Sequence, residues 1–375
     1  MISLNVKTKK FLNIYGIQFF YSFAHLFAFG LLFLYLFQIG FTTLEIAIFS
    51  TLQYFGAFMT LFFIKTVDFK KISTLSIILK SFYLLLFIVF IKGFELVQLY
   101  FIAILAGAVL FMFWVPYNIK FFSFGNNKNN AFMSSILFLL WPILNMFLPG
   151  LAGYAVNSYG FKFLFIVSAA INLLAIICIK WSDNGLILKF NLKNALKNTK
   201  GVKTLLYLEG FFQGILWTAI PLATILYLSN AIDYGLFFSY LGLFGAIASV
   251  ILSRLSDNIK NRTSFIYPVA FLLGLSAILT GFASTFIVWA IANALLTFLA
   301  TIFSPFQTAV VLDKSKNLVD SMASRELFLN FGRTSGGIIA ILSLLLFSKS
   351  EYSLLLAGSS VFVYAIVMRG KKLYV

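Results

Sequence analysis

Four ionisable side chains occur inside long apolar runs of the sequence, where a charge is costly. They are His25, Lys80, Glu209 and Arg333. An ionisable group in the hydrocarbon of a bilayer costs at least about 2.5–3.5 kcal/mol on insertion scales, so each is a candidate functional residue. A carboxylate, a guanidinium and an imidazole in apolar surroundings can bind an anionic group, form an ion pair or exchange a proton.

Each of these residues also has a simpler structural interpretation. His25 could only donate one hydrogen bond between helices, and Lys80 could extend its stem so that the ammonium reaches the membrane surface. Glu209 and Arg333 are harder to explain in this way. We predict that Arg333 holds an anionic group of a substrate, or Glu209 when the site is empty, and that protonation of Glu209 releases the arginine. The alternative is a static ion pair between two helices.

The composition places these residues in a membrane protein. The chain has 375 residues, of which 61% are hydrophobic and 10% charged, whereas soluble domains carry about 25% charged residues. A water-soluble globular enzyme is therefore excluded. The single cysteine, Cys178, excludes an internal disulfide, and the single histidine excludes a multi-histidine metal site. With no nucleotide-binding loop or paired buried carboxylates in the sequence, we expect neither enzyme activity nor a cofactor.

Twelve apolar runs are long enough to cross a bilayer, which takes about 20 residues. The first six are 11–38, 43–64, 72–92, 96–118, 131–156 and 161–181. The other six are 204–228, 233–253, 264–283, 285–311, 326–347 and 351–368. These runs are apolar throughout and lack the alternation of membrane-barrel strands. The sequence therefore predicts an all-α integral membrane protein with twelve transmembrane helices.

The net charge of +17 is an orientation signal. Outside the spans, the basic residues gather in alternate loops, and only Lys92, Lys162 and Lys349 fall in the other set. Because cytoplasmic loops carry the excess of Lys and Arg, both termini are predicted to be cytoplasmic. We expect no nucleic-acid partner. Abundant Lys, Asn, Ile and Phe suggest an AT-rich prokaryotic genome, and hence an inner or plasma membrane.

The two halves of the sequence match at one offset of 189 residues. This offset places Pro305 on Pro116 and Gln307 on Asn118. A repeat of six spans returns the chain to its starting side, so the halves are predicted to be parallel repeats. The predicted parts are a six-helix bundle at 1–181, a basic cytoplasmic linker at 182–203 and a second six-helix bundle at 204–375. The linker is either an amphipathic helix on the anionic leaflet or a solvated connection.

A six-plus-six parallel repeat with a basic linker resembles the major facilitator superfamily. That family carries a loop motif, Gly-x-Leu-Ala-Asp-Arg/Lys-x-Gly-Arg-Arg/Lys, after span two and again after span eight. The second copy, 253–262, agrees at Leu255, Asp257 and Arg262, and the first keeps Asp68 with Lys70 and Lys71. Ser253, Asn258 and Lys260 depart from the motif. The resemblance implies that Asp68, Asp257 and Arg262 form a gating latch between the halves. The alternative is loop aspartates that balance nearby lysines.

The resemblance also implies a function. In this family spans one, four, seven and ten line a central cavity, two, five, eight and eleven flank it, and the others lie outside. The implied residues for substrate binding or coupling are Gln18, Tyr21, His25, Asn118, Glu209, Gln213, Trp217, Gln307, Asn330 and Arg333. We expect a monomeric secondary active transporter that moves a small organic solute by alternating access in the lipid bilayer, coupled to protons. The alternatives are an uncoupled facilitator, an exporter of lipophilic drugs or lipids, and a non-transporting receptor or scaffold.

Overall fold

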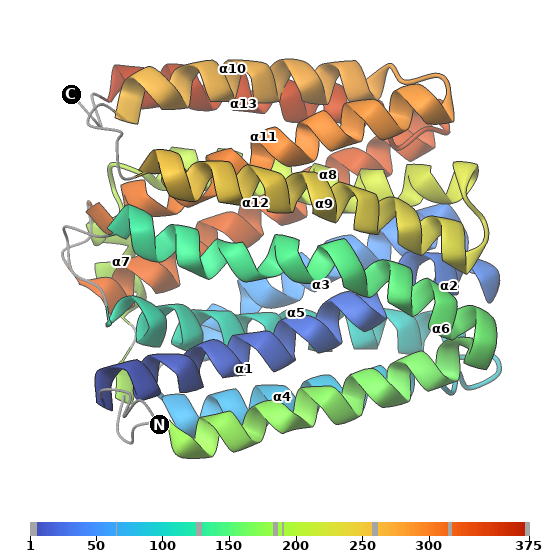
Figure 1. Cartoon of the computed structure of the whole chain (residues 1–375), viewed down its shortest axis with the longest axis horizontal. Coiled ribbons are helices and arrows are strands. Elements are labelled where there is room, and N and C mark those ends of the chain that lie inside the picture. The colour runs from blue at the N-terminus through green and yellow to red at the C-terminus, as the bar shows by residue number, and fades with distance from the viewer. Residues whose placement is uncertain are drawn as a thin grey trace.

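The computed structural model describes residues 6–64, 66–124, 130–182, 187–189, 191–256, 262–313 and 317–371. Within these ranges the chain forms a bundle of long helices lying side by side (Figure 1). The first six predicted spans correspond to α1 (Val6–Phe29) with α2 (Leu32–Gln38), α3 (Thr43–Phe63), α4 (Phe69–Leu86), α5 (Glu95–Phe122) and α6 (Asn130–Trp181). The last six correspond to α8 (Lys203–Tyr227), α9 (Ala231–Ser256), α10 (Arg262–Gly281), α11 (Phe286–Asp313), α12 (Leu318–Phe347) and α13 (Ser353–Gly370).

The prediction of an all-α membrane fold is confirmed. Nine helical segments in the described part of the chain are long and apolar enough to cross a membrane. One of them, Met133–Trp181, contains both the fifth and the sixth predicted spans, because α6 reverses direction at Gly160 (Figure 1). Gly160 has a φ of 76°, which glycine adopts without a steric penalty. The shorter or more polar helices α4 and α10 supply the third and ninth spans.

The helices at the two edges of the bundle are those that the resemblance placed outside. The helix α4 and the second part of α6 form one edge, and α10 and α13 form the opposite edge (Figure 1). Between these edges, α6 packs on α9 and α3 packs on α12, so the first and last six spans meet through these pairs. Ser50 on α3 and Thr218 on α8 share a buried hydrogen bond of 2.9 Å across the same boundary.

The helix α1 begins and α13 ends at the same end of the bundle, as an even number of spans requires (Figure 1). We call this the terminal end. Here β1 (Thr66–Asp68) pairs antiparallel with β2 (Ile187–Lys189), and α7 (Leu192–Asn198) lies against α12. The described part of the linker is therefore a short strand followed by a seven-residue helix, not one long amphipathic helix. This small sheet was not predicted, because strands were considered only as membrane-crossing segments.

Apolar side chains from both sets of spans pack together at both ends of the bundle. At the terminal end one buried cluster includes Phe121 of α5 and Met322 of α12. Toward the opposite end another cluster includes Leu148 of α6, and Leu222 of α8. Inside a bilayer the gain from such packing is van der Waals contact between the side chains, so these clusters help to hold the two sets together.

Candidate functional site

The polar cluster of the last six spans is built where α8 and α12 approach most closely. Gly210 and Gly214 on α8 are four residues apart, and so are Gly332 and Gly336 on α12. A Cβ on Gly210 would collide with the backbone of Leu329, and the other three glycines are packed as tightly against the facing helix. Small residues at this spacing let the backbones of membrane helices approach. The side chains beside them are thereby held within hydrogen-bonding reach.

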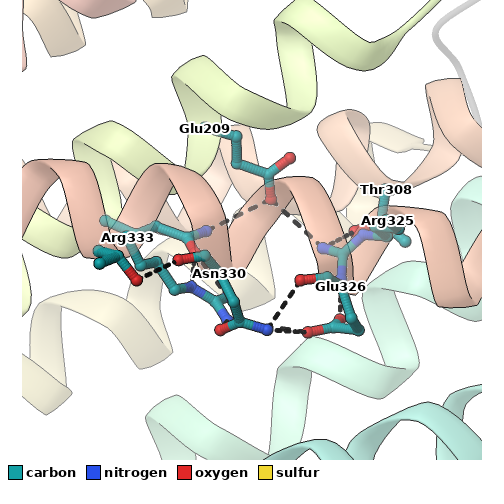
Figure 2. Close-up of polar contacts among 8 residues, drawn as sticks. Glu209, Thr308, Arg325, Glu326, Asn330 and Arg333 are labelled. Carbon is teal, nitrogen blue, oxygen red and sulfur yellow. Dashed lines mark hydrogen bonds and ion pairs between the residues drawn. The ribbon is translucent and has the colours of Figure 1, made fainter. Parts of the chain in front are cut away.

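The carboxylate of Glu209 is bound by Arg325. Its Oε1 lies 3.3 Å from Nη2 of Arg325, whose Nη1 lies 2.7 Å from Oε1 of Glu326. The same Nη2 donates to Oγ1 of Thr308 on α11 at 3.0 Å. Figure 2 shows Glu209 and Arg325 facing each other, with Thr308 beside the guanidinium. All four side chains are buried, and three helices contribute to this part of the cluster.

Arg333 forms the other part of the cluster, about two turns after Arg325 on α12. Its Nε and Nη2 both donate to Oε1 of Gln213, at 3.0 and 2.7 Å. Its Nη1 donates to Oδ1 of Asn330 at 3.0 Å and lies 3.7 Å from Oε2 of Glu326. The guanidinium also lies over the ring of Trp217, with 4.8 Å to the ring centroid. Arg333 is the most exposed of the four charged side chains, at 14%.

Gln213 connects the two parts. While its Oε1 accepts from Arg333, its Nε2 donates to Oε1 of Glu209 at 3.3 Å. The formal charges of the two glutamates and two arginines balance, which offsets part of the cost of removing them from water. On α12, Arg325 and Arg333 lie 7 and 15 residues after Leu318, or about 10 and 22 Å along the helix. The cluster therefore extends from near the terminal end to the middle of the bundle.

The predicted direct pairing of Glu209 with Arg333 is wrong, because Arg325 occupies the place beside Glu209. Arg325 lies one residue before the predicted span 326–347 and so falls among the loop cations of the prediction, and Glu326 is not among the predicted site residues. The helix α12 begins at Leu318, well before the predicted start at 326, because Asn317 caps it. The Oδ1 of Asn317 accepts hydrogen bonds from the backbone N–H of Val319 and of Asp320, at 2.9 and 3.3 Å. An asparagine followed by an acidic first turn is a helix-start signal that could have revealed this.

A second group of candidates lies in the first six spans. Lys80 does not extend toward the surface but is completely buried, which corrects that interpretation. Its Nζ donates to the backbone oxygen of Tyr21 at 2.8 Å and lies 3.4 Å from the centroid of the Tyr21 ring. That ring stacks on Phe113 at 3.5 Å. One turn further along α1, the ring of His25 lies 5.3 Å from Trp141, and its buried Nδ1 has no hydrogen-bond partner in the described structure.

The remaining predicted binding residues lie apart from these two groups. Gln18 is engaged between helices, donating to the backbone oxygen of Leu137 and accepting from the hydroxyl of Tyr117, both at 2.8 Å. Asn118 and Gln307 are buried on α5 and α11. Among the described residues, no hydrogen bond connects either of them to the charged cluster. On α11 the neighbour of Gln307, Thr308, makes that contact instead.

The three residues of the predicted latch are only partly described. Asp68 caps α4 by accepting the backbone N–H of Lys71 at 3.1 Å. This is a local structural role that the loop motif did not reveal. Asp257 and the side chain of Arg262 lie outside the described residues. The latch between Asp68, Asp257 and Arg262 therefore stays a prediction.

A bundle of membrane-spanning helices with paired charges in its middle has the architecture of a membrane transport protein. A family model described as Major Facilitator Superfamily matches residues 14–341. The chain belongs to this superfamily and is a multi-pass membrane transporter, not an enzyme. A comparison with curated proteins gives no significant match.

Solved structures of other transporters are similar to this chain over nearly its whole length. The human organic anion transporter MFSD10 is 13% identical, with a TM-score of 0.68, covering 97% of this chain and 100% of its own. The E. coli fucose:proton symporter FucP is 12% identical, with a TM-score of 0.69, covering 98% and 100%. A POT family transporter in complex with 5-aminolevulinic acid is 13% identical, with a TM-score of 0.71, covering 96% of both chains. At these identities the likeness shows the fold.

Proposed function

We propose that this transporter is secondary active and carries a small organic anion by alternating access, coupled to protons. The halves 1–181 and 204–375, connected by the linker 182–203, would rock about a site between them. In the proposed orientation the terminal end is cytoplasmic, in an inner or plasma membrane. The packing of α6 on α9 and of α3 on α12 supports this proposal, because these pairs connect the two halves.

The anion proposal rests on what binds one edge of the Arg333 guanidinium, the edge formed by Nε and Nη2, which we call the Arg333 fork. Nε and Nη2 form the planar edge with which arginine binds a carboxylate through two parallel hydrogen bonds. In this structure both donors are directed at the single amide oxygen of Gln213. A substrate carboxylate offers two charged oxygens to the same edge and displaces a neutral acceptor. The ring of Trp217, which is about half exposed, lies beside the guanidinium and provides a contact for an organic substituent.

The same displacement gives a route to proton coupling. When the amide of Gln213 leaves Arg333, its Nε2 also leaves Oε1 of Glu209, so substrate binding changes the contacts of that carboxylate. Glu326 contacts both arginines, whereas Glu209 contacts only Arg325 among the ion pairs of the described residues. Protonation of Glu209 therefore breaks fewer ion pairs than protonation of Glu326 would. Substrate and proton binding are linked reciprocally if each changes the affinity for the other.

The names of the similar structures are compatible with this proposal. They include an organic anion transporter, a fucose:proton symporter and a complex with 5-aminolevulinic acid. The fold therefore accommodates anionic cargo in one relative and proton coupling in another. These names support the proposal without identifying the substrate of this chain.

A substitution that exchanges acid and amide tests the anion site. Purified protein is heated with acetate, lactate, benzoate or succinate at constant ionic strength, with sodium chloride as the reference. We expect at least one carboxylate to raise the melting temperature of the wild type, because binding to the folded form stabilises it. The double variant Glu209→Gln/Gln213→Glu keeps the net charge but occupies the Arg333 fork permanently. It should fold and lose this stabilisation, as should Arg333→Gln.

The single variant Glu209→Gln is the matched control, because it leaves the fork and Gln213 in place and should still bind the carboxylate. In proteoliposomes it should lose accumulation driven by a proton gradient while keeping exchange of the same carboxylate. Carboxylate stabilisation that persists in Arg333→Gln would refute the anion site. Gradient-driven accumulation at the wild-type level in Glu209→Gln would refute coupling through this residue.

A further inference from the structure

Lys80 is a buried base with no acid near it in its own half of the chain. Residues 1–181 contain only three acidic residues, and each lies at the start of a helix. Glu45 belongs to the capping box of α3, Asp68 caps α4 and Glu95 lies in the first turn of α5. Lys80 lies 11 residues after Phe69, about 16 Å along α4. Asp68 is therefore far from it along α4, and neither Glu45 nor Glu95 forms an ion pair with it in the described structure.

The contacts of Lys80 are those that favour an ammonium over a neutral amine. The backbone oxygen of Tyr21 accepts a hydrogen bond from Nζ, and the face of the Tyr21 ring carries the negative part of its quadrupole toward the same atom. Stacking on Phe113 and an edge contact with Trp114 at 5.8 Å fix the orientation of that ring. A cation on Lys80 is thus stabilised by two contacts from α1, without a counter-ion among the residues that the structure describes.

His25 lies on α1 one turn beyond Tyr21, whose backbone oxygen accepts the hydrogen bond from Nζ of Lys80. Its ring is stacked on Phe29 at 4.5 Å, and its buried Nδ1 lacks a partner among the described residues. The other titratable groups around the pair are phenols: Tyr21 itself, Tyr83 on α4 and Tyr117 on α5. The helix α6 contributes Trp141 and Asn172, which do not titrate.

We propose that Lys80 and His25 form a second proton-binding site of the transporter, which holds one proton on either Nζ or Nδ1. Two positive charges beside the same turn of α1, with no carboxylate paired to either among the described residues, would repel each other in apolar surroundings. In this structure the proton belongs on Lys80, where the carbonyl and the ring of Tyr21 stabilise it. A movement of α1 that withdraws Tyr21 breaks an N–H bond of the ammonium and forms one at Nδ1. The total charge of the chain does not change.

This site extends the proposed proton coupling but does not depend on the Arg333 fork. The cluster on α8 and α12 belongs to the last six spans, and Lys80 and His25 belong to the first six. With a proton site in each half, proton binding depends on the relative position of α1 and α4 as well as on whether an anion occupies the Arg333 fork. The proton on Lys80 also supplies the first six spans with a positive charge that an anionic substrate can balance.

The single histidine of the chain makes the proposal directly testable. Protein labelled with 15N-histidine in nanodiscs gives the imidazole signals of His25 alone, and these are followed as a function of pH without any substrate. Replacing Lys80 by methionine keeps an unbranched side chain but removes the nearby charge. We expect Lys80→Met to move the midpoint of the His25 titration upward by about one pH unit or more.

Lys162→Met is the matched control, because it removes an exposed lysine at the opposite end of the bundle. It should leave the midpoint unchanged. Tyr21→Leu removes the ring below Nζ and keeps the backbone oxygen, so it should move the midpoint in the same direction by a smaller amount. This second variant decides the question if Lys80→Met does not fold. An unchanged midpoint in whichever of the two folds overturns the proposal. Because α8 and α12 are untouched, that outcome leaves the Arg333 site standing.

Discussion

The charges of Glu209, Arg325, Glu326 and Arg333 balance one another through direct contacts, whereas Lys80 relies on a carbonyl oxygen and an aromatic ring. Both arrangements bury polar groups in the middle of a membrane bundle. In the first, each member has several partners, and in the second the positive charge can leave Lys80 without leaving an opposite charge behind. One fold can therefore stabilise buried charges either by pairing them with opposite charges or by placing them against a carbonyl dipole and the face of an aromatic ring.

The largest effect should come from the glycines that bring α8 and α12 together. Gly210→Leu places a branched side chain against the backbone of Leu329, and the helices must separate. We expect a loss of more than about 4 kcal/mol, enough to prevent recovery of folded protein. Gly16→Ala is the control in the first six spans, because a Cβ there faces the side chain of Cys178. Size-exclusion chromatography in detergent distinguishes the two, and a normal monodisperse peak for Gly210→Leu would contradict the close packing.

A smaller effect should follow from breaking the charge balance. Arg325→Met leaves Glu209 and Glu326 with Arg333 as the remaining guanidinium of the cluster, and removing one partner of a buried pair costs about 3–5 kcal/mol. The double variant Arg325→Met/Glu209→Gln restores the balance and should recover a large part of this loss. The free energy of unfolding in mixed micelles measures both. Strict additivity of the two single substitutions would show that the residues do not act as a pair.

The smallest effect compares two hydroxyl groups. Thr308→Val removes an acceptor for Arg325, and a hydrogen bond to a charged group contributes about 1.5–3 kcal/mol. Tyr21→Phe removes a buried hydroxyl that has no partner in the described structure, while the ring below Lys80 remains. We expect its unfolding free energy to stay within about 0.5 kcal/mol of wild type. A loss in Tyr21→Phe as large as that in Thr308→Val would reveal a partner of the tyrosine hydroxyl.

Hydropathy was sufficient to predict the helical membrane fold, because apolar length is the dominant constraint in a bilayer. It also identified Glu209 and Arg333, whose charges interrupt apolar runs. It missed Arg325 and Glu326, because both lie close to the predicted boundary of their span, where a charge carries no information about burial. Whether Gln213 and Arg333 face each other depends on how α8 and α12 are rotated about their axes. The paired glycines at 210, 214, 332 and 336 determine this rotation, and hydropathy does not record it.

The sheet formed by β1 and β2 has a consequence for biosynthesis. Its register pairs Thr66 with Lys189, and α4, α5 and the two parts of α6 cross the bundle between these two strands. The strands can meet only after the ribosome has delivered all of these segments and each has entered the bilayer. A missed crossing would leave β2 on the wrong face of the membrane, unable to reach β1. Closure of this sheet therefore depends on the correct insertion of the third to sixth spans, and it can form before the last six have been translated.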